Sequence, residues 1–229
     1  MSVENHRRGI SQQYRHLFRR LFALYGPQGW WPARGATEVL LGAVLTQHTA
    51  WRNVEQALAR LRAATRLTPQ GVLALDPEQL ARLIHPAGYP RVKAHRLRNL
   101  LAWCDRRGGI AALRRATTED LRAELLRVHG VGPETADSIL LYALHRPLFV
   151  VDAYARRLFS RLGLLGGGEP YDAIRISVER SLRGVTRDLN EFHALIVRHG
   201  KDPCRPRPRC AACRLVKICR YPVSLRPHD

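Results

Sequence analysis

The stretch Leu125–Asp137, which reads LLRVHGVGPETAD, predicts two helices joined by a very tight turn. Two glycines, Gly130 and Gly132, bracket a single apolar residue after the first helix. Glycine allows a sharp turn with no side chain in the way. Pro133 suits the first position of the next helix, because its missing N–H would be unpaired there anyway. The stretch therefore predicts a helix-hairpin-helix element in which Val131 points into the core.

The sequence on both sides of this hairpin is also patterned for helices. Apolar residues recur at helical spacing between Pro, Gly and capping residues. The predicted helices are Ser11–Tyr25, Thr37–Thr46, Trp51–Ala64, Pro77–Ile84, Arg91–Arg107, Thr118–Val128, Pro133–Leu144 and Ala153–Leu164. Leu148–Val151 is the one β-rich apolar run, and it is too short to build a sheet. The predicted fold class is all-α.

The charge of the chain points to a polyanionic partner. Lys and Arg total 38 against 19 Asp and Glu, which gives a formal net charge of +19 over 229 residues. A GC-rich genome would explain why only three of these cations are lysine, but not their twofold excess. Nucleic acid is the first candidate partner.

The hairpin supplies a way to hold such a partner. Its glycines would let a phosphate approach the N–H groups at the start of the second helix. Contacts of this kind grip a DNA backbone without reading its sequence. We expect Gly130, Val131, Gly132 and Thr135 to contact DNA. An ordinary glycine turn is the alternative, and the strongly basic chain favours the DNA interpretation.

Asp152 follows the apolar run and precedes the helix Ala153–Leu164. Aspartate there is very often only an N-cap. A cap can also be catalytic, because the helix N-terminus keeps the carboxylate ionised. A fixed carboxylate stabilises an oxocarbenium-like cation and can orient or deprotonate a water.

The hairpin, followed by Val150-Val151-Asp152, resembles the helix-hairpin-helix DNA glycosylases of the endonuclease III superfamily, over about residues 30–219. The resemblance implies base excision from damaged double-stranded DNA, with Asp152 as the catalytic residue. It implies two helical domains that flank a DNA-binding cleft. Residues 35–145 would form a six-helix barrel with the hairpin, and residues 1–34 and 146–229 a cluster domain.

Glu134 decides the expected reaction type. Bifunctional members of the superfamily carry a lysine two residues past the second glycine, and that lysine forms a Schiff base with the sugar. Glutamate cannot do so, and none of the three lysines, Lys93, Lys201 and Lys217, is near it in the chain. We predict a monofunctional glycosylase with water as the nucleophile and a weak or absent AP-lyase step.

Two segments suggest which base is removed. Trp30-Trp31-Pro32 and the segment 41–51 resemble the 3-methyladenine branch of the superfamily. That resemblance implies a pocket in which Trp30, Trp31 and Glu134 face the flipped base. An aromatic slot suits a cationic alkylated purine. Core packing is the alternative for the tryptophans, and adjacent residues cannot easily face one pocket.

The same resemblance assigns two DNA-contacting side chains. Gln47 would fill the space that the flipped base leaves, and Tyr89 would wedge into the opposite strand. A surface glutamine and a loop aromatic are the alternatives. Two rival functions stay open: an endonuclease III-like glycosylase for oxidised pyrimidines or uracil, and a lesion-binding protein with little or no catalysis.

Cys204, Cys210, Cys213 and Cys219 are spaced C-x5-C-x2-C-x5-C. Four thiolates in one short loop suit zinc or a [4Fe–4S] cluster, and the spacing alone does not choose. The superfamily pattern, C-x6-C-x2-C-x5-C at the same C-terminal place, implies a [4Fe–4S] cluster held by these four residues. The first interval here is one residue shorter. Cys104 has apolar neighbours and is expected to be a buried free thiol.

The remaining expectations concern the cellular location and the oligomeric state of the protein. No run approaches the roughly 20 apolar residues that a membrane span needs. Residues 1–10 lack the apolar core of a signal peptide. We expect a cytoplasmic monomer.

Overall fold

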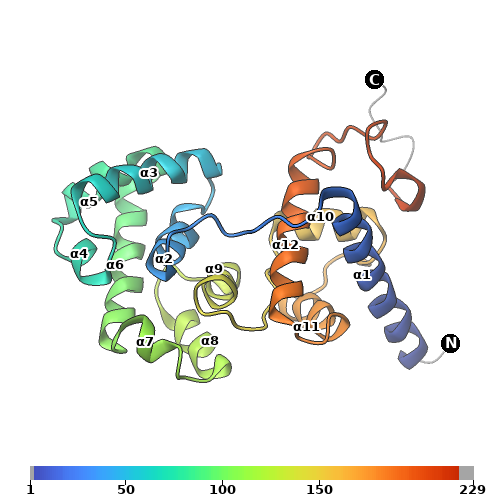
Figure 1. Ribbon diagram of the computed structural model, residues 1–229, viewed down its shortest axis with the longest axis horizontal. Coiled ribbons are helices and arrows are strands. Elements are labelled where there is room, and N and C mark those ends of the chain that lie inside the picture. The colour runs from blue at the N-terminus through green and yellow to red at the C-terminus, as the bar shows by residue number, and fades with distance from the viewer. Residues whose placement is uncertain (1–2, 222–229) are drawn as a thin grey trace. The chain divides into compact units, whose positions relative to one another are not determined.

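The computed structural model describes residues 3–221, and over that range it is built from helices and connecting loops with no β-strand. The prediction of an all-α fold is confirmed. The chain divides into two compact units, which are described separately. One unit is residues 31–146, and the other combines the chain before residue 31 with the chain after residue 146 (Figure 1).

The unit 31–146 carries the hairpin. Its helices are α2 (Ala36–Leu45), α3 (Trp51–Ala64), α4 (Pro69–Leu73), α5 (Pro77–Ile84), α6 (Pro90–Arg106), α7 (Gly109–Leu113), α8 (Thr118–Arg127) and α9 (Pro133–Ser138). A 3₁₀ turn, His85–Ala87, precedes α6, and a π-helical segment, Ile139–Ala143, continues α9. Helix α6 packs against α2, α4 and α5, and the π-helical segment packs against α2. The longest predicted helix of this unit is thus its central one.

The starts of these helices follow from single residues. Thr68, Asp76 and Thr117 each accept a hydrogen bond from a backbone N–H in the first turn of α4, α5 and α8. Such caps satisfy N–H groups that have no partner within the helix. The apolar face of α6 is then buried through Leu97, which is fully inaccessible to solvent. Local capping and core burial therefore agree in this unit.

The second unit consists of α1 (Val3–Tyr25), α10 (Ala153–Arg161), α11 (Tyr171–Ser181), α12 (Thr186–Lys201) and a 3₁₀ turn, Val216–Ile218. Helix α12 packs against both α1 and α10. An aromatic cluster joins these elements: Phe159 lies 4.9 Å from Tyr14 and 6.1 Å from Phe192, ring centroid to ring centroid. Helices α11 and α12 were not among the predicted helices.

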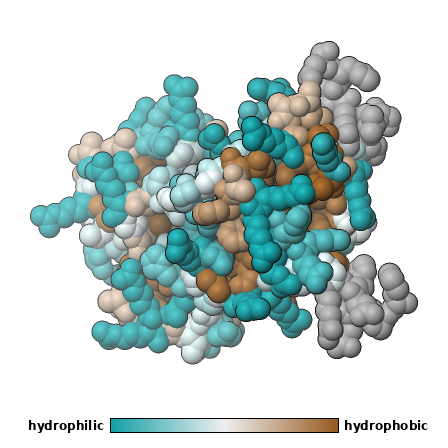
Figure 2. Space-filling view, turned by 45° about the vertical axis from the view of Figure 1, so that its right-hand side comes forward, coloured by the Kyte–Doolittle hydropathy of each residue, from teal (hydrophilic) through white to brown (hydrophobic). Residues whose placement is uncertain are grey.

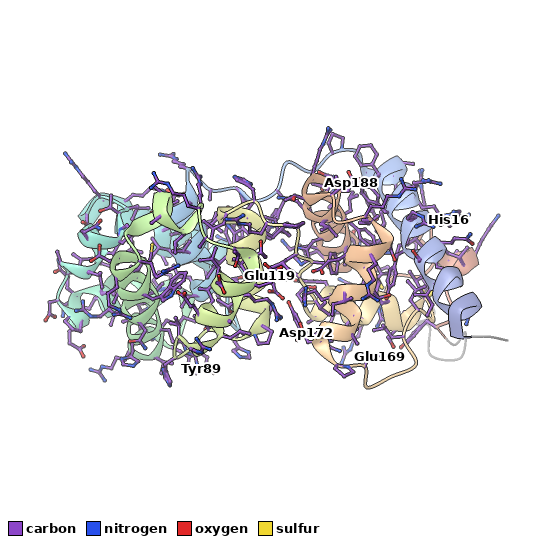
Figure 3. The ribbon with its side chains drawn as sticks, turned by 90° about the horizontal axis from the view of Figure 1, so that it is seen from below. His16, Tyr89, Glu119, Glu169, Asp172 and Asp188 are labelled. Atoms are coloured by element: carbon purple, nitrogen blue, oxygen red, sulfur yellow. The ribbon has the colours of Figure 1, made fainter. Side chains whose placement is uncertain are left out.

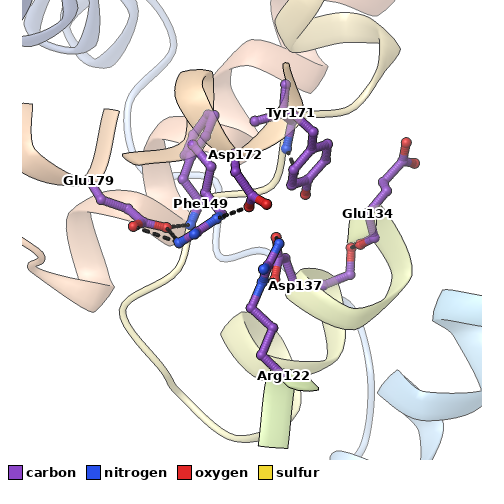
Figure 4. A network of polar contacts seen from close by, with 10 residues as sticks. Arg122, Glu134, Asp137, Phe149, Tyr171, Asp172 and Glu179 are labelled. Carbon is purple, nitrogen blue, oxygen red and sulfur yellow. Dashed lines mark hydrogen bonds and ion pairs between the residues drawn. The ribbon is translucent and has the colours of Figure 1, made fainter. Parts of the chain in front are cut away.

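The apolar run Leu148–Val151 leads into α10 as buried extended chain without a strand partner. Side chains of α11 satisfy its backbone instead. The N–H of Phe149 donates to Glu179 (2.9 Å) and the N–H of Val151 donates to the Tyr171 hydroxyl (3.3 Å) (Figure 4). This segment fixes the position at which α10 begins, and therefore the position of Asp152.

Figure 2 shows hydrophilic side chains over much of the visible surface, interrupted by apolar patches. Within residues 3–221, no helix is long and apolar enough to cross a membrane.

Candidate functional site

The hairpin forms as predicted between α8 and α9. Gly130 adopts a left-handed φ of 93°, and the N–H of Val131 donates to the carbonyl of Val128 (3.0 Å). Val131 is only 6% exposed, so it anchors the turn in the core. Gly132 caps α9, with Pro133 in its first turn. The N–H groups of Gly130 and Gly132 have no acceptor among the described residues, so both can donate a hydrogen bond to an acceptor atom of a ligand.

Gln47 is tied to this hairpin. Its side-chain amide donates to the carbonyl of Gly130 (3.1 Å) and to the hydroxyl of Thr135 (3.0 Å). Its carbonyl oxygen accepts from Arg96 at 2.6 Å. Thr135 is 7% exposed, so its hydroxyl faces Gln47. The structure therefore brings three predicted DNA-contacting residues together, and Gln47 would have to exchange these bonds to enter a duplex.

A buried ion pair joins the two helices of the hairpin. Arg122 on α8 donates to both carboxylate oxygens of Asp137 on α9, at 2.7 and 3.2 Å (Figure 4). The Asp137 side chain is fully buried and that of Arg122 is 15% exposed. Removing one partner of such a pair leaves an uncompensated charge. The pair therefore fixes how α9 leaves the turn.

Tyr89 lies at the surface of the same unit (Figure 3). It is 69% exposed and adopts a left-handed φ of 46° just before α6. A large aromatic side chain so exposed has few contacts that stabilise the fold. Its position agrees with a role in contacting a partner.

The two tryptophans have different surroundings. Trp31 packs against Trp51 and Tyr142, with ring centroids 5.1 and 5.0 Å apart. Trp30 belongs to the other unit, where the ammonium of Lys201 lies 5.5 Å from its ring centroid. Glu134 is exposed on α9. The structure therefore places Trp31 in a cluster with Trp51 and Tyr142.

Asp152 is the N-cap of α10, and only one carboxylate oxygen serves as the cap. Its Oδ1 accepts from the N–H of Ala155 at 2.8 Å. Its Oδ2 lies 3.4 Å from Nε2 of His193, and the side chain is 13% exposed. The cap orients the carboxylate, while the side chain as a whole keeps limited exposure to solvent. Capping and chemistry are thus compatible at this residue.

His193 is a neighbour of Asp152 that the sequence interpretation missed. It lies on α12 and is 5% exposed. The signal was present, because Leu189, Phe192 and Ile196 repeat at helical spacing and predict a buried face there. A histidine within that run would have been expected near the core.

The four cysteines of residues 204–219, called the cysteine loop, line one cavity together with Arg161 and Tyr221. The Arg161 guanidinium donates to Sγ of Cys204 (3.2 Å), and Sγ of Cys213 lies 3.7 Å from Nε2 of His199. Burial raises the pKa of Cys213, and the neighbouring thiols raise it further. The donor set fits a group that binds four thiolates at once.

Among the described residues, no three His, Cys, Asp or Glu side chains are grouped to hold a metal ion. Four thiolates are the ligand set both of a structural zinc site and of a [4Fe–4S] cluster.

Comparison with known proteins agrees with this geometry. Residues 41–183 match the HhH-GPD superfamily of base excision DNA repair proteins. The chain is 44% identical over 206 residues to a Methanocaldococcus jannaschii protein named as a candidate DNA repair glycosylase. That match covers 89% of this chain and 94% of the relative.

Two solved structures are similar in fold. One is the H. pylori 3-methyladenine DNA glycosylase bound to 1,N6-ethenoadenine, with a TM-score of 0.73, 26% identity, and 84% of this chain and 97% of that chain covered. The other is a non-covalent endonuclease III–DNA complex, with a TM-score of 0.75, 25% identity, and 92% and 95% covered.

The chain therefore belongs to the HhH-GPD superfamily of base excision DNA repair proteins. It is a DNA glycosylase of the endonuclease III superfamily, as the sequence resemblance implied.

Proposed function

We propose that the protein is a monofunctional glycosylase that hydrolyses the N-glycosidic bond of an alkylated purine flipped from damaged duplex DNA. The observation that carries this proposal is the carboxylate of Asp152, which is held by the N–H of Ala155 through Oδ1 while the side chain keeps 13% of its surface exposed. Glu134, in the position where a nucleophilic lysine would stand, supports hydrolysis over a lyase step.

The proposed reaction uses water as the nucleophile. The bond between the sugar and the base breaks, and the electron pair leaves with the base. An alkylated purine is cationic, so it departs as a neutral molecule. Asp152 stabilises the positive charge that develops on the sugar and accepts the proton of the attacking water. The hairpin holds the backbone meanwhile through the N–H groups of Gly130 and Gly132, with Val131 and Thr135 as its inner supports.

The aromatic cluster around Trp31 supports the choice of base. Aromatic faces favour a cationic ring system over a neutral pyrimidine. Trp51 packs against Trp31 at an interplanar angle of 86°, and the buried Tyr142 packs against it at 54°. Trp30 would act with Lys201 in the other unit, so we assign the base contact to Trp31. The likeness to a 3-methyladenine glycosylase structure points in the same direction.

Excision of oxidised pyrimidines or uracil is the second candidate. The observation in its favour is the likeness to the endonuclease III–DNA complex. Glu134 argues against the lyase step that accompanies bifunctional members. The two candidates predict different substrates, so one assay separates them.

The test compares wild type with Asp152→Asn on duplexes carrying an alkylated purine, thymine glycol or uracil. Base release and strand nicking are scored separately. Because Asn also caps helices, the variant should fold normally and yet release base about 100-fold more slowly or worse. The matched control is Asp76→Asn, since Asp76 is also an N-cap aspartate; its rate should equal that of wild type.

Three results would contradict the proposal. Release of only thymine glycol or uracil would favour the second candidate. Borohydride trapping of an enzyme–DNA adduct in good yield would show a covalent mechanism. No release from any of the duplexes, with binding retained, would favour a lesion-binding protein.

We also propose that Cys204, Cys210, Cys213 and Cys219 hold a [4Fe–4S] cluster. When bound, the cluster would cross-link the cysteine loop. Arg161 and His199 would donate to its thiolates, and the surrounding cations would face DNA phosphates. Equal amounts of iron and sulfide in anaerobically purified brown protein would support this, and stoichiometric zinc without iron would contradict it. We expect a cytoplasmic monomer, which light scattering of the purified protein would check for mass.

A further inference from the structure

Lys93 is a buried lysine that the proposed mechanism does not use. Its side chain lies in the first turn of α6 and the residue is 2% exposed. Its ammonium donates to the carbonyl of Leu45 (2.9 Å) and to the carbonyl of Ala87 (2.7 Å). A buried cation is costly unless it is paired. Here two backbone carbonyls serve as the partners of the buried ammonium.

Both carbonyls stand at the end of a helical element. Leu45 is the last residue of α2, and Ala87 is the last residue of the 3₁₀ turn. Terminal carbonyls lack partners within their helix and carry partial negative charge. The Lys93 ammonium therefore provides a hydrogen-bond donor to the C-terminal carbonyls of two helical elements and fixes the distance between these two helix ends.

Each of these two helix ends is followed closely by a candidate DNA-contacting residue. Gln47 lies two residues after Leu45, and Tyr89 lies two residues after Ala87. The backbone beyond each end is left-handed at a non-glycine residue, with φ of 53° at His48 and 46° at Tyr89. Such conformations persist only where the surrounding structure holds them.

The next turn of α6 extends this arrangement to the hairpin. Arg96 donates to Gln47, and a Cβ placed on Gly130 would clash with Cγ of Arg96. Helix α6 thus touches the Gln47 segment, the Tyr89 segment and the hairpin within its first two turns. Three segments that are far apart in the sequence share one support.

We propose that Lys93 is a positioning residue that holds Gln47 and Tyr89 in one register, so that both side chains enter the duplex together when a base is flipped. The inference rests on the proposed function, because it assigns these two side chains to DNA. Lys93 itself is too buried, and too fully engaged by carbonyls, to reach a sugar. Burial lowers its pKa to about 8, with Arg96 contributing. At neutral pH it therefore still carries the protons that it donates.

The test reads coupling between the two side chains instead of catalysis. Binding of Gln47→Ala, Tyr89→Ala and the double variant is measured on a duplex with an abasic-site analogue opposite 2-aminopurine, whose fluorescence reports unstacking. In the wild-type background the two substitutions should be coupled, by about threefold or more in affinity and in fluorescence change. In a Lys93→Met background, which keeps the volume and removes the donors, the effects should become additive.

Two further variants complete the design. Arg96→Met removes the bond to Gln47 and leaves Lys93 in place, so coupling should fall only in part. Lys93→Arg restores charged donors and should recover some coupling. If Lys93→Met does not fold, Lys93→Gln, which keeps an N–H donor group, enters the same cycle and should show reduced coupling.

Coupling that is unchanged in a folded Lys93→Met protein would overturn the proposal, as would additive effects already present in the wild-type background. Borohydride trapping that disappears in Lys93→Met would make Lys93 a nucleophile and would also overturn it. The assay needs no base release. A protein that binds and distorts the duplex without excision would therefore fail the proposed function while still deciding the role of Lys93.

Discussion

The hairpin and the cysteine loop are both short connections rich in glycine or proline, but they hold their shape by different means. In the hairpin, Val131 is buried and the Gln47 amide satisfies the turn carbonyl. In the cysteine loop, most residues between Arg205 and Lys217 are exposed or half-buried. Core packing therefore specifies the hairpin, whereas the cysteine loop has too little apolar surface to do the same.

Two cations of α10 compensate for part of this shortage. Arg161 donates to the backbone carbonyls of Arg205 (2.8 Å) and Pro206 (2.9 Å), and Arg157 donates to that of Cys204 (2.9 Å). These bonds fasten the first half of the cysteine loop to α10. The second half, from Cys210 to Cys219, has fewer such ties among the described residues. We therefore predict that this loop depends on the proposed cluster for its shape, and that the hairpin needs no bound group.

The largest expected effect is the loss of a loop cysteine. Cys213→Ser should yield protein without iron, because one ligand of four is lost. A group that binds only the folded state stabilises it, so its loss should lower stability by about 3 kcal/mol or more, or roughly 6 °C in Tm. Iron analysis and thermal unfolding measure both quantities.

The control is Cys104→Ala, which removes a cysteine outside the loop. It should keep its full iron content and lose less stability. Full iron content in Cys213→Ser would show that the cysteine loop holds its group without this ligand, and the contrast with the hairpin would lose its basis.

A second, smaller effect is expected at the hairpin. Gly130→Ala should destabilise the protein by about 2 kcal/mol, because the left-handed φ is unfavourable for alanine and the new Cβ meets Arg96. Gly132→Ala is the matched control, since its φ is −94° and no atom lies within 4 Å of an added Cβ. Chemical denaturation compares the two variants.

The same pair separates folding from binding. Gly132→Ala should remain as stable as wild type and still bind duplex DNA more weakly, because the methyl group occupies the approach to the hairpin N–H groups. Equal DNA affinity for Gly132→Ala and wild type would remove the hairpin from the interface.

Much of this fold was predictable because its signals are local. The bounds of α3 and α5 agree with the prediction residue for residue, since Pro77 and a regular apolar spacing mark them. The hairpin followed from two glycines and one proline. Asp152 was found because it stands where an apolar run ends and a helix begins.

The missed features depend on contacts between distant segments. The contacts of Lys93 with Leu45 and Ala87 could not be predicted, because sequence separation does not show that α6 packs against both segments. His193 was missed for the same reason, since it meets Asp152 from α12. The tryptophan pair could not be resolved either, because the boundary between the units falls between Trp30 and Trp31. Periodicity predicts faces of helices, but not which faces meet.

A third prediction sharpens the account of the cysteine loop. Arg161→Met keeps the length of the side chain and removes its donors, so the loop carbonyls at Arg205 and Pro206 lose their partners. We expect about 1 to 2 kcal/mol of destabilisation, together with faster proteolysis within the loop. Arg156→Met is the control, because Arg156 donates to Glu169 and not to the loop. Equal protease sensitivity in both variants would mean that Arg161 does not fasten the loop.

The smallest expected effect concerns Cys104, the cysteine outside the loop. It is fully buried in α6, and burial raises its pKa from the ordinary 9.0 to about 11. Because the folded pKa is the higher one, its contribution to stability is present below pH 9 and is lost as pH rises towards 11. At pH 9.5 the loss should be under about 1 kcal/mol.

The measurement is the difference in unfolding free energy between wild type and Cys104→Ala from pH 8 to pH 10. Taking this difference cancels the contributions of the titratable groups that the two proteins share. That difference should shrink as pH rises, and a thiol reagent should leave Cys104 unmodified at neutral pH. A difference that stays constant would mean that Cys104 ionises as freely as an exposed thiol.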